Sequence, residues 1–158
     1  MKYVIIGHGG HSKVIKDLIE SREGHMIIAY LDDKYELLDT IMDVYIGPVH
    51  SIRLILNQHP DVKVVIAIGD NKTRKAIVEE LNLPPEYYSP LISENAVISP
   101  SAQIDIGTVI MPGAIINAEA SIGKHVSVNN CAIVYHDCRI GEYAHVSPRG
   151  CLPGDVTL

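Results

Sequence analysis

Hydrophobic and polar residues follow two different rhythms along this chain. Up to about residue 90, short aliphatic runs alternate with stretches whose apolar residues have helical spacing. The pattern predicts strands at Tyr3–Ile6, Met26–Leu31 and Val62–Ile68, a short extended piece at Ile46–Val49, and helices at His11–Ser21, Ser51–Asn57 and Lys72–Leu83. Because strands alternate with helices, we expect an α/β domain with a parallel sheet over residues 1–90.

From about residue 91 the pattern changes to a strict period of six. The aliphatic residue of each six is Ile98, Ile104, Ile110, Ile116, Ile122, Val128, Val134, Ile140, Val146, Leu152 and Leu158. Two places before each stands a small or β-branched residue, namely Ala96, Ala102, Thr108, Ala114, Ala120, Val126, Ala132, Cys138, Ala144, Gly150 and Val156. Neither an α-helix nor simple strand alternation has this period, and an all-β sandwich would match it only by chance.

We interpret residues 91–158 as a left-handed parallel β-helix built from hexapeptide repeats. Each repeat makes a short strand and a corner, and both periodic series point into a narrow three-sided core. Gly, Asn or Pro after the aliphatic residue suits the corner backbone, as at Asn117, Gly123, Asn129, Gly141 and Pro153. Leu158 falls at an inward position with no polar capping unit after it. We therefore expect a chain that is short at its C-terminus or that covers this end.

Composition narrows the class of protein. Hydrophobic residues make up 47% of the chain, but Trp and Phe are absent, so Ile, Val, Leu and Ala must form the core. The formal net charge is −6 and no basic patch stands out, which argues against nucleic acid as a partner. Three cysteines without a CxxC spacing argue against a disulfide framework. The apolar start of the chain is too short for a membrane span, so we expect a cytoplasmic protein without membrane insertion.

The first candidate site is the loop Gly7-His8-Gly9-Gly10-His11-Ser12, which follows a strand and opens a helix. Glycines let the backbone approach a ligand, and the N–H groups of a helix N-terminus favour phosphate. The third glycine of the dinucleotide fingerprint is absent here. Strand, turn and acidic residues nevertheless follow the order of a Rossmann-like nucleotide site, and we favour a nucleotide-sugar over NAD. Asp32 and Asp33 end the second strand, where a ribose or base contact is expected. A tight turn without a ligand is the alternative.

A second candidate is Ala67–Asn71, at the carboxyl end of the third strand. Ligands of open α/β sheets bind at this edge. The alternative is that Asp70 or Asn71 only caps the next helix.

The third candidate is His136 with Asp137, just before a new repeat. A corner histidine projects outward, and imidazole is the natural base near neutral pH. A plain surface histidine is one alternative. Zinc bound by His125, His136 and His145 between subunits is another, but these residues fall at different positions of the repeat.

The chain resembles the bacterial sugar O- and N-acetyltransferases of the sialic acid O-acetyltransferase and UDP-amino-sugar N-acetyltransferase group, within the hexapeptide-repeat acyltransferases. The segments that carry the resemblance are residues 7–12, 31–33, 67–71, 99–102 and, most specifically, 128–147. An exopolysaccharide-biosynthesis member is suggested. Tyr135 stands where an acidic or amide residue is common in the family, and Arg149 where Gly is common.

The resemblance implies specific roles. His136 matches the catalytic base and Asp137 an acid that supports it, whereas His145 and Gly154 match contacts to acetyl-CoA. The residues that match the nucleotide-sugar-binding region are Gly9, Gly10, His11, Asp32, Asp33, Lys34, Gly69 and Asn71. The family is a homotrimer with active sites between adjacent β-helices, acetyl-CoA is the co-substrate, and no metal is implied.

The resulting hypothesis is an acetyl-CoA-dependent acetyltransferase acting on an amino group of a nucleotide-linked sugar, with His136 as general base. O-acetylation of a sugar hydroxyl, a truncated non-catalytic trimer that binds a nucleotide-sugar, and a zinc hydratase are the alternatives.

Overall fold

A five-stranded sheet forms the first of two units in the computed structural model, which describes residues 1–158. The units are Met1–Tyr88 and Ser89–Leu158, whereas the sequence placed the division after residue 90. The elements of the first unit are β1 (Lys2–Ile6), α1 (Gly10–Glu20), β2 (Met26–Leu31), β3 (Asp39–Ile41), β4 (Val44–Gly47), the 3₁₀ turn η1 (Val49–Ser51), α2 (Ile52–Gln58), β5 (Lys63–Ile66), α3 (Asn71–Leu81) and the 3₁₀ turn η2 (Pro85–Tyr87).

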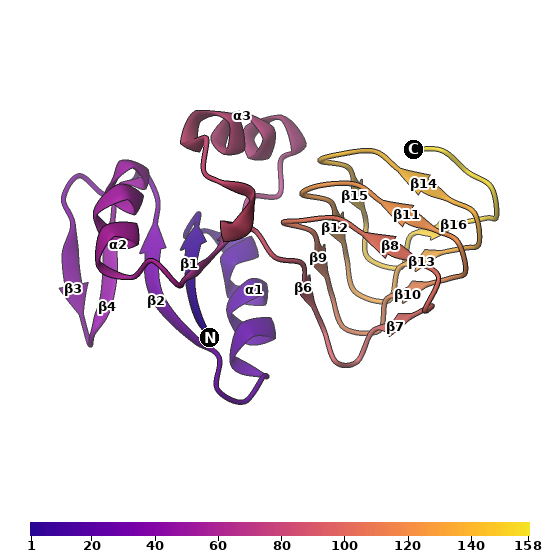
Figure 1. Cartoon of the computed structure of the whole chain (residues 1–158), viewed down its shortest axis with the longest axis horizontal. Helices are drawn as coiled ribbons and strands as arrows, with labels where there is room; N and C mark the ends of the chain where they lie inside the picture. The colour runs from indigo at the N-terminus through magenta and orange to yellow at the C-terminus, as the bar shows by residue number, and fades with distance from the viewer. The chain divides into compact units, whose positions relative to one another are not determined.

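The sheet runs in the order β3-β4-β2-β1-β5, and all its pairs are parallel except β3 with β4. Figure 1 shows β3, β4, β2 and β1 in this order. Strand β1, which lies between β2 and β5, carries Val4, Ile5 and Ile6, none of which has exposed surface. A continuous aliphatic run of this kind is typical of a parallel strand that is covered on both faces. The Rossmann-like α/β arrangement predicted from the sequence is confirmed.

The hairpin of β3 and β4 was not predicted in full. Only the piece around Ile46 was expected to be extended, and β3 was missed. The two turn residues, Met42 and Asp43, both have a left-handed backbone, with φ of 50° and 64°. Such turns usually carry Asn-Gly or Asp-Gly, and Met-Asp gives no comparable signal.

The second unit is a stack of two-residue strands that recur every six residues. They are β6 (Leu91–Ile92), β7 (Val97–Ile98), β8 (Gln103–Ile104), β9 (Val109–Ile110), β10 (Ile115–Ile116), β11 (Ser121–Ile122), β12 (Ser127–Val128), β13 (Ile133–Val134), β14 (Arg139–Ile140), β15 (His145–Val146) and β16 (Cys151–Leu152). Each strand pairs in parallel with the strand one coil away, so that Ile116 lies between Ile98 and Val134. Three sheets result, as the left-handed β-helix requires (Figure 1).

The two periodic series form the interior of this unit. Ala114, Ala120, Ala132 and Cys138 have no exposed surface, and the aliphatic residues of the middle coils are buried beside them. Leu158, the last member of the aliphatic series, is 52% exposed.

The corners of the coils are type II-like turns with one left-handed residue, placed directly before the small inward residue. Glu119, His125, Cys131, Asp137, Tyr143, Arg149 and Asp155 occupy this position with positive φ, as do Gly107 and Gly113. The residue after the aliphatic one lies in the same corner, at the start of the turn rather than at its left-handed position. Asn117 and Asn129 open the turns, and their carbonyls accept the closing hydrogen bonds from Ala120 and Ala132.

No helix in the structure is both long enough and apolar enough to cross a bilayer.

Candidate functional site

A cavity of about 390 Å³ lies in the first unit, at the carboxyl ends of three parallel strands. Its lining residues are Ile6, Gly7, Gly9, Gly10, His11, Asp32, Asp33, Val49, Ala67, Ile68, Gly69, Thr73 and Ile77. The segments that follow β1, β2 and β5 therefore meet at one place. This is the edge at which ligands of open α/β sheets bind.

The glycine-rich loop forms one wall of the cavity. Gly7 has φ +100°, and a Cβ there would lie 2.8 Å from the Ala67 carbonyl oxygen, so the chain requires glycine at this point. A Cβ added at Gly9 or at Gly10 would have no heavy atom within 4 Å, so the backbone of both residues is open to a ligand. Ser12 stands where the fingerprint has its third glycine, and its hydroxyl donates to the Gly9 carbonyl (2.7 Å).

Asp32 ties this loop to the end of β2. Its carboxylate accepts hydrogen bonds from the backbone N–H of His8 (2.8 Å) and from that of Lys34 (3.0 Å). Burial alone would raise the pKa of Asp32, but these two donors and the charge of Lys34 outweigh it and lower the pKa below its ordinary value. Asp33 accepts in turn from the backbone N–H of Val49 (2.9 Å).

The side chain of His8 was not singled out from the sequence. Its ring stacks on Tyr30 with centroids 4.3 Å apart, and its Nδ1 is 2.7 Å from the Tyr35 hydroxyl. Burial lowers the pKa of His8, and the charge of Lys34 adds to this against the opposing effect of Asp32. The dipeptide His8-Gly9 inside a loop gives no sequence signal for such a contact.

The segment between β5 and α3 forms the opposite wall. Asp70 caps α3, because its carboxylate accepts from the backbone N–H and the hydroxyl of Thr73 (2.7 Å each). The capping interpretation is thus confirmed for Asp70. Arg74, which sequence reasoning missed, donates to the carbonyls of Ile68 (2.8 Å) and Gly69 (3.1 Å) and to Asn71 Oδ1 (3.0 Å).

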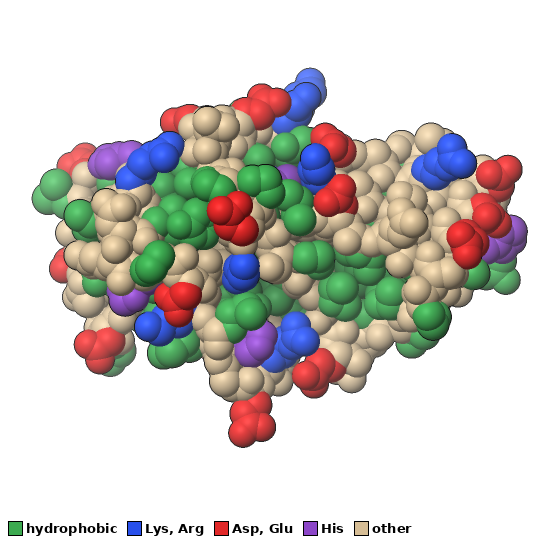
Figure 2. All heavy atoms as spheres, viewed as in Figure 1, with side chains coloured by type: hydrophobic (Ala, Val, Ile, Leu, Met, Phe, Trp, Pro, Cys, Tyr) green, Lys and Arg blue, Asp and Glu red, His purple; other side chains and the backbone are tan.

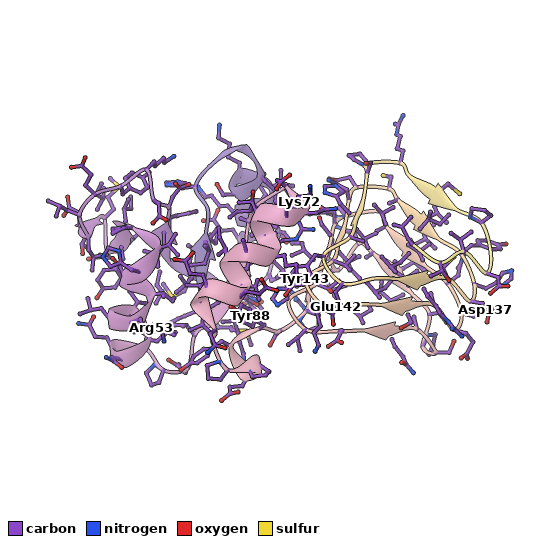
Figure 3. All side chains as sticks on the ribbon, turned by 90° about the horizontal axis from the view of Figure 1, so that it is seen from above. Arg53, Lys72, Tyr88, Asp137, Glu142 and Tyr143 are labelled. Atoms are coloured by element: carbon purple, nitrogen blue, oxygen red, sulfur yellow. The ribbon has the colours of Figure 1, made fainter.

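His136 lies at a corner of the β-helix, where its Nδ1 is 2.7 Å from Asp137 Oδ2. Both side chains are about half exposed, and Asp137 projects from the outer edge of a coil (Figure 3). Gly154 occupies the same place one coil further on. A Cβ at Gly154 would lie 2.6 Å from both Cε1 and Nε2 of His136, so the imidazole rests directly against this glycine.

The other predicted histidines lie elsewhere on the coils. Asn129 Nδ2 donates to Nε2 of His145 (3.3 Å), and His125 is buried and stacks on Tyr143 with centroids 5.4 Å apart. The chain contains no group of three or more His, Cys, Asp or Glu side chains placed to hold a metal ion.

The family model of the PglD N-terminal domain matches residues 2–81. The chain belongs to this sugar acetyltransferase family. It is 42% identical over 107 residues to a UDP-N-acetylbacillosamine N-acetyltransferase of Bacillus subtilis (68% of this chain, 50% of the relative). It is 28% identical over 93 residues to a GDP-perosamine N-acetyltransferase of Escherichia coli O157:H7 (59% of this chain, 42% of the relative). The chain thus spans about half the length of the curated relatives that it matches.

Solved structures support the same family over nearly the whole chain. A histidine-to-alanine mutant of GDP-perosamine N-acetyltransferase from Caulobacter crescentus, in complex with CoA and GDP-perosamine, matches with a TM-score of 0.85 and 29% identity over 99% of this chain and 73% of that one. The acetyltransferase domain of PglB from Neisseria gonorrhoeae, in complex with acetyl coenzyme A, matches with a TM-score of 0.79 and 31% identity over 99% and 75%.

Within this family member, the cavity brings together most of the residues predicted for nucleotide-sugar binding. Gly9, Gly10, His11, Asp32, Asp33 and Gly69 line it, and Lys34 and Asn71 do not. Lys34 instead donates from Nζ to the His8 carbonyl (2.6 Å), and Asn71 accepts from Arg74. Val49, Thr73 and Ile77 line the cavity as well but were not predicted. Their positions depend on how the helices pack, which local sequence patterns do not specify.

Proposed function

We propose that this protein transfers the acetyl group of acetyl-CoA to an amino group of a nucleotide-linked sugar, with His136 as general base. The observation that carries the proposal is the hydrogen bond between His136 Nδ1 and Asp137 Oδ2 in the β-helix of a sugar acetyltransferase family member. The relatives named above are N-acetyltransferases of a UDP-linked and a GDP-linked sugar. Their names support an amino group as acceptor.

The cavity of the first unit is the proposed nucleotide-sugar site. The open backbone of Gly9 and Gly10 begins the eleven-residue helix α1, whose N-terminal N–H groups favour a diphosphate. Asp33 and Gly69 lie on the adjoining walls and would contact the ribose or base. Asp32 would contribute to nucleotide-sugar binding by holding the glycine-rich loop through its hydrogen bond from the His8 N–H.

The proposed reaction needs one proton acceptor. Asp137 holds the His136 tautomer that carries hydrogen on Nδ1, which leaves the lone pair of Nε2 to accept a proton. The sugar amine attacks the thioester carbon, Nε2 takes the amine proton, and the C–S bond breaks as the tetrahedral intermediate collapses. The imidazolium then returns the proton to the leaving CoA thiolate. Asp137 stabilises the imidazolium during the step.

Acetyl-CoA is expected to reach His136 along the side of the coil that carries Gly154. A backbone N–H of this region or His145 would stabilise the oxyanion. The proposed site lies between subunits of a homotrimer. An apolar column of outward-facing residues supports this part of the proposal, namely Val97, Ile115, Ile133 and Cys151. It belongs to the sheet that includes β13, the strand directly before the His136 corner.

The test is acetyl transfer from acetyl-CoA to GDP-perosamine and to UDP-linked amino sugars, followed by release of the CoA thiol. His136→Ala should lower kcat by roughly 10²- to 10⁴-fold, the usual contribution of a general base. The affinity of the variant for UDP or GDP alone, measured by calorimetry, is the internal control and should stay at the wild-type value.

Unchanged turnover in His136→Ala would disprove the catalytic assignment. A nucleotide sugar that bears only hydroxyl groups separates the two acceptor classes, because its acetylation at a comparable kcat/KM would favour O-acetylation. A protein that binds nucleotide sugars but not acetyl-CoA would be a non-catalytic binding trimer.

A further inference from the structure

His8 stands between the glycines of the loop that follows β1. Gly7, Gly9 and Gly10 line the cavity, whereas His8 does not. A loop of glycines has many accessible conformations, and fixing one of them on binding costs entropy. Contacts that fix His8 therefore also fix the backbone conformation of Gly7 and Gly9, which line the cavity.

His8 is held at four places, and every contact leads to the segment Tyr30–Tyr35. Its N–H donates to Asp32 Oδ2 (2.8 Å), and its carbonyl accepts from Lys34 Nζ (2.6 Å). Its ring stacks on Tyr30 and meets the Tyr35 hydroxyl at Nδ1 (2.7 Å). The loop after β1 is thus fastened to the end of β2 through main chain and side chain together.

The hydroxyl of Tyr35 decides the orientation of the ring. A neutral imidazole with hydrogen on Nε2 accepts from this hydroxyl at Nδ1, and stacking on Tyr30 fixes the ring plane. The groups that face His8 are Tyr30, Tyr35, Lys34 and Asp32. Burial and the charge of Lys34 lower the pKa of His8, which favours the neutral imidazole.

We propose that His8 and Tyr35 are positioning residues that lock the glycine-rich loop in its ligand-receiving conformation from behind the cavity. The identity of that ligand as a nucleoside diphosphate rests on the proposed function, but the lock itself does not. Asp32 and Lys34 also hold the loop, because they bond to the main chain of His8, and Asp32 lines the cavity as well.

The test compares Tyr35→Phe with Tyr45→Phe. Both remove a hydroxyl that bonds to another side chain of the same unit, since the Tyr45 hydroxyl donates to Gln58 Oε1 (3.0 Å), but Tyr45 lies away from the loop on β4. Hydrogen exchange without ligand should be about three- to tenfold faster for the amides of residues 7–12 in Tyr35→Phe, as expected for loss of one hydrogen bond. In Tyr45→Phe these amides should exchange at the wild-type rate.

Calorimetry with UDP and with GDP gives the second measurement. Tyr35→Phe should weaken the binding of whichever nucleotide the wild type accepts by about three- to tenfold. His8→Ala should weaken it more, and His8→Asn, whose amide can still reach the Tyr35 hydroxyl, should restore part of the loss. If His8 and Tyr35 only stabilised the fold, variants with equal melting temperatures would bind the nucleotide equally well.

Three outcomes decide the matter. Wild-type exchange at residues 7–12 in both Tyr35→Phe and His8→Ala overturns the proposal. A rise in exchange spread evenly over the whole unit also overturns it, because a lock acts locally. A wild type that binds neither UDP nor GDP contradicts the proposed function, while the exchange measurement still supports or rejects the lock.

Discussion

The imidazole of His136 rests against a residue one coil away, and this contact makes Gly154 a sensitive position. Gly154 has no left-handed backbone, so its chain accepts alanine, and only the collision with Cε1 and Nε2 of His136 follows. A side chain yields more easily than backbone. The coil should therefore persist while the imidazole moves away from its place.

Gly154→Ala should lower kcat by roughly 10- to 100-fold, because a displacement of about 1 Å at a reacting group has effects of this size. The fold should be retained, which the melting temperature and circular dichroism check. In a His136→Ala background the same substitution should change nothing further. Additive losses in the double variant would show that Gly154 acts independently of the imidazole.

Residue types and spacing predicted many residues of the candidate site, whereas the others depend on tertiary packing and were found only in the structure. The loop glycines and the paired aspartates were recognisable because parallel strands bring their carboxyl ends to one edge. The four anchors of His8 and the three bonds of Arg74 were not, since each joins segments whose approach depends on tertiary packing. Lys34 was predicted to belong to the nucleotide-sugar-binding region. Its Nζ donates to the His8 carbonyl, and it does not line the cavity.

At the scale of the element, the hexapeptide repeat is governed by the space available inside the coil. Ala132 has no exposed surface and stacks between Ala114 and Gly150, its equivalents in the neighbouring coils. Each of these positions follows a left-handed residue, where the chain bends into the next strand. A larger side chain at this point meets packed neighbours rather than solvent.

Ala132→Leu should therefore destabilise the β-helix by about 1–3 kcal/mol, the range for overpacked cores. Chemical denaturation followed by circular dichroism measures the change. Ala118→Leu is the matched control, because Ala118 is exposed on a corner and should remain within about 0.5 kcal/mol of the wild type. Equal effects of the two substitutions would contradict the inward assignment of the small residues.

The contrast between the repeat and the β3–β4 hairpin explains why one was predicted and the other missed. Every coil has the same limited space, so the same residue types recur every six residues and the repeat can be recognised in the sequence. The hairpin depends on a single turn at Met42 and Asp43, whose residue types do not indicate their left-handed backbone. The left-handed residue of each corner gave no sequence signal for the same reason, because Glu, Tyr and Arg occupy positions that Gly more commonly fills.

At the scale of the whole molecule, one sheet of the β-helix is apolar on its outer side. In the sheet of β7, β10, β13 and β16 the outward column is Val97, Ile115, Ile133 and Cys151, with Val97 63% exposed. The sheet of β8, β11 and β14 carries Gln103, Ser121 and Arg139 at the equivalent positions. Hydrophobic side chains are visible on the surface of this unit in Figure 2. An aliphatic column in water favours burial against another surface.

We expect a second copy of the chain to pack against this apolar column, because the proposed active site lies beside it. Ile133 lies three residues before His136, so a subunit that covers the apolar column also approaches the imidazole corner. Sedimentation or light scattering should give a mass of three times 17.3 kDa. Ile133→Lys should shift the protein toward monomers, because burying an unpaired ammonium in an apolar contact is strongly unfavourable.

The same variant should lose acetyl transfer in parallel with the trimer, whereas its affinity for UDP or GDP should persist, since the cavity lies wholly within Met1–Tyr88. Ser121→Lys on the polar sheet is the matched control and should leave both mass and turnover unchanged. Full turnover by a monomeric Ile133→Lys protein would place every catalytic group within one chain. A wild type that sediments at 17.3 kDa would reject the trimer altogether.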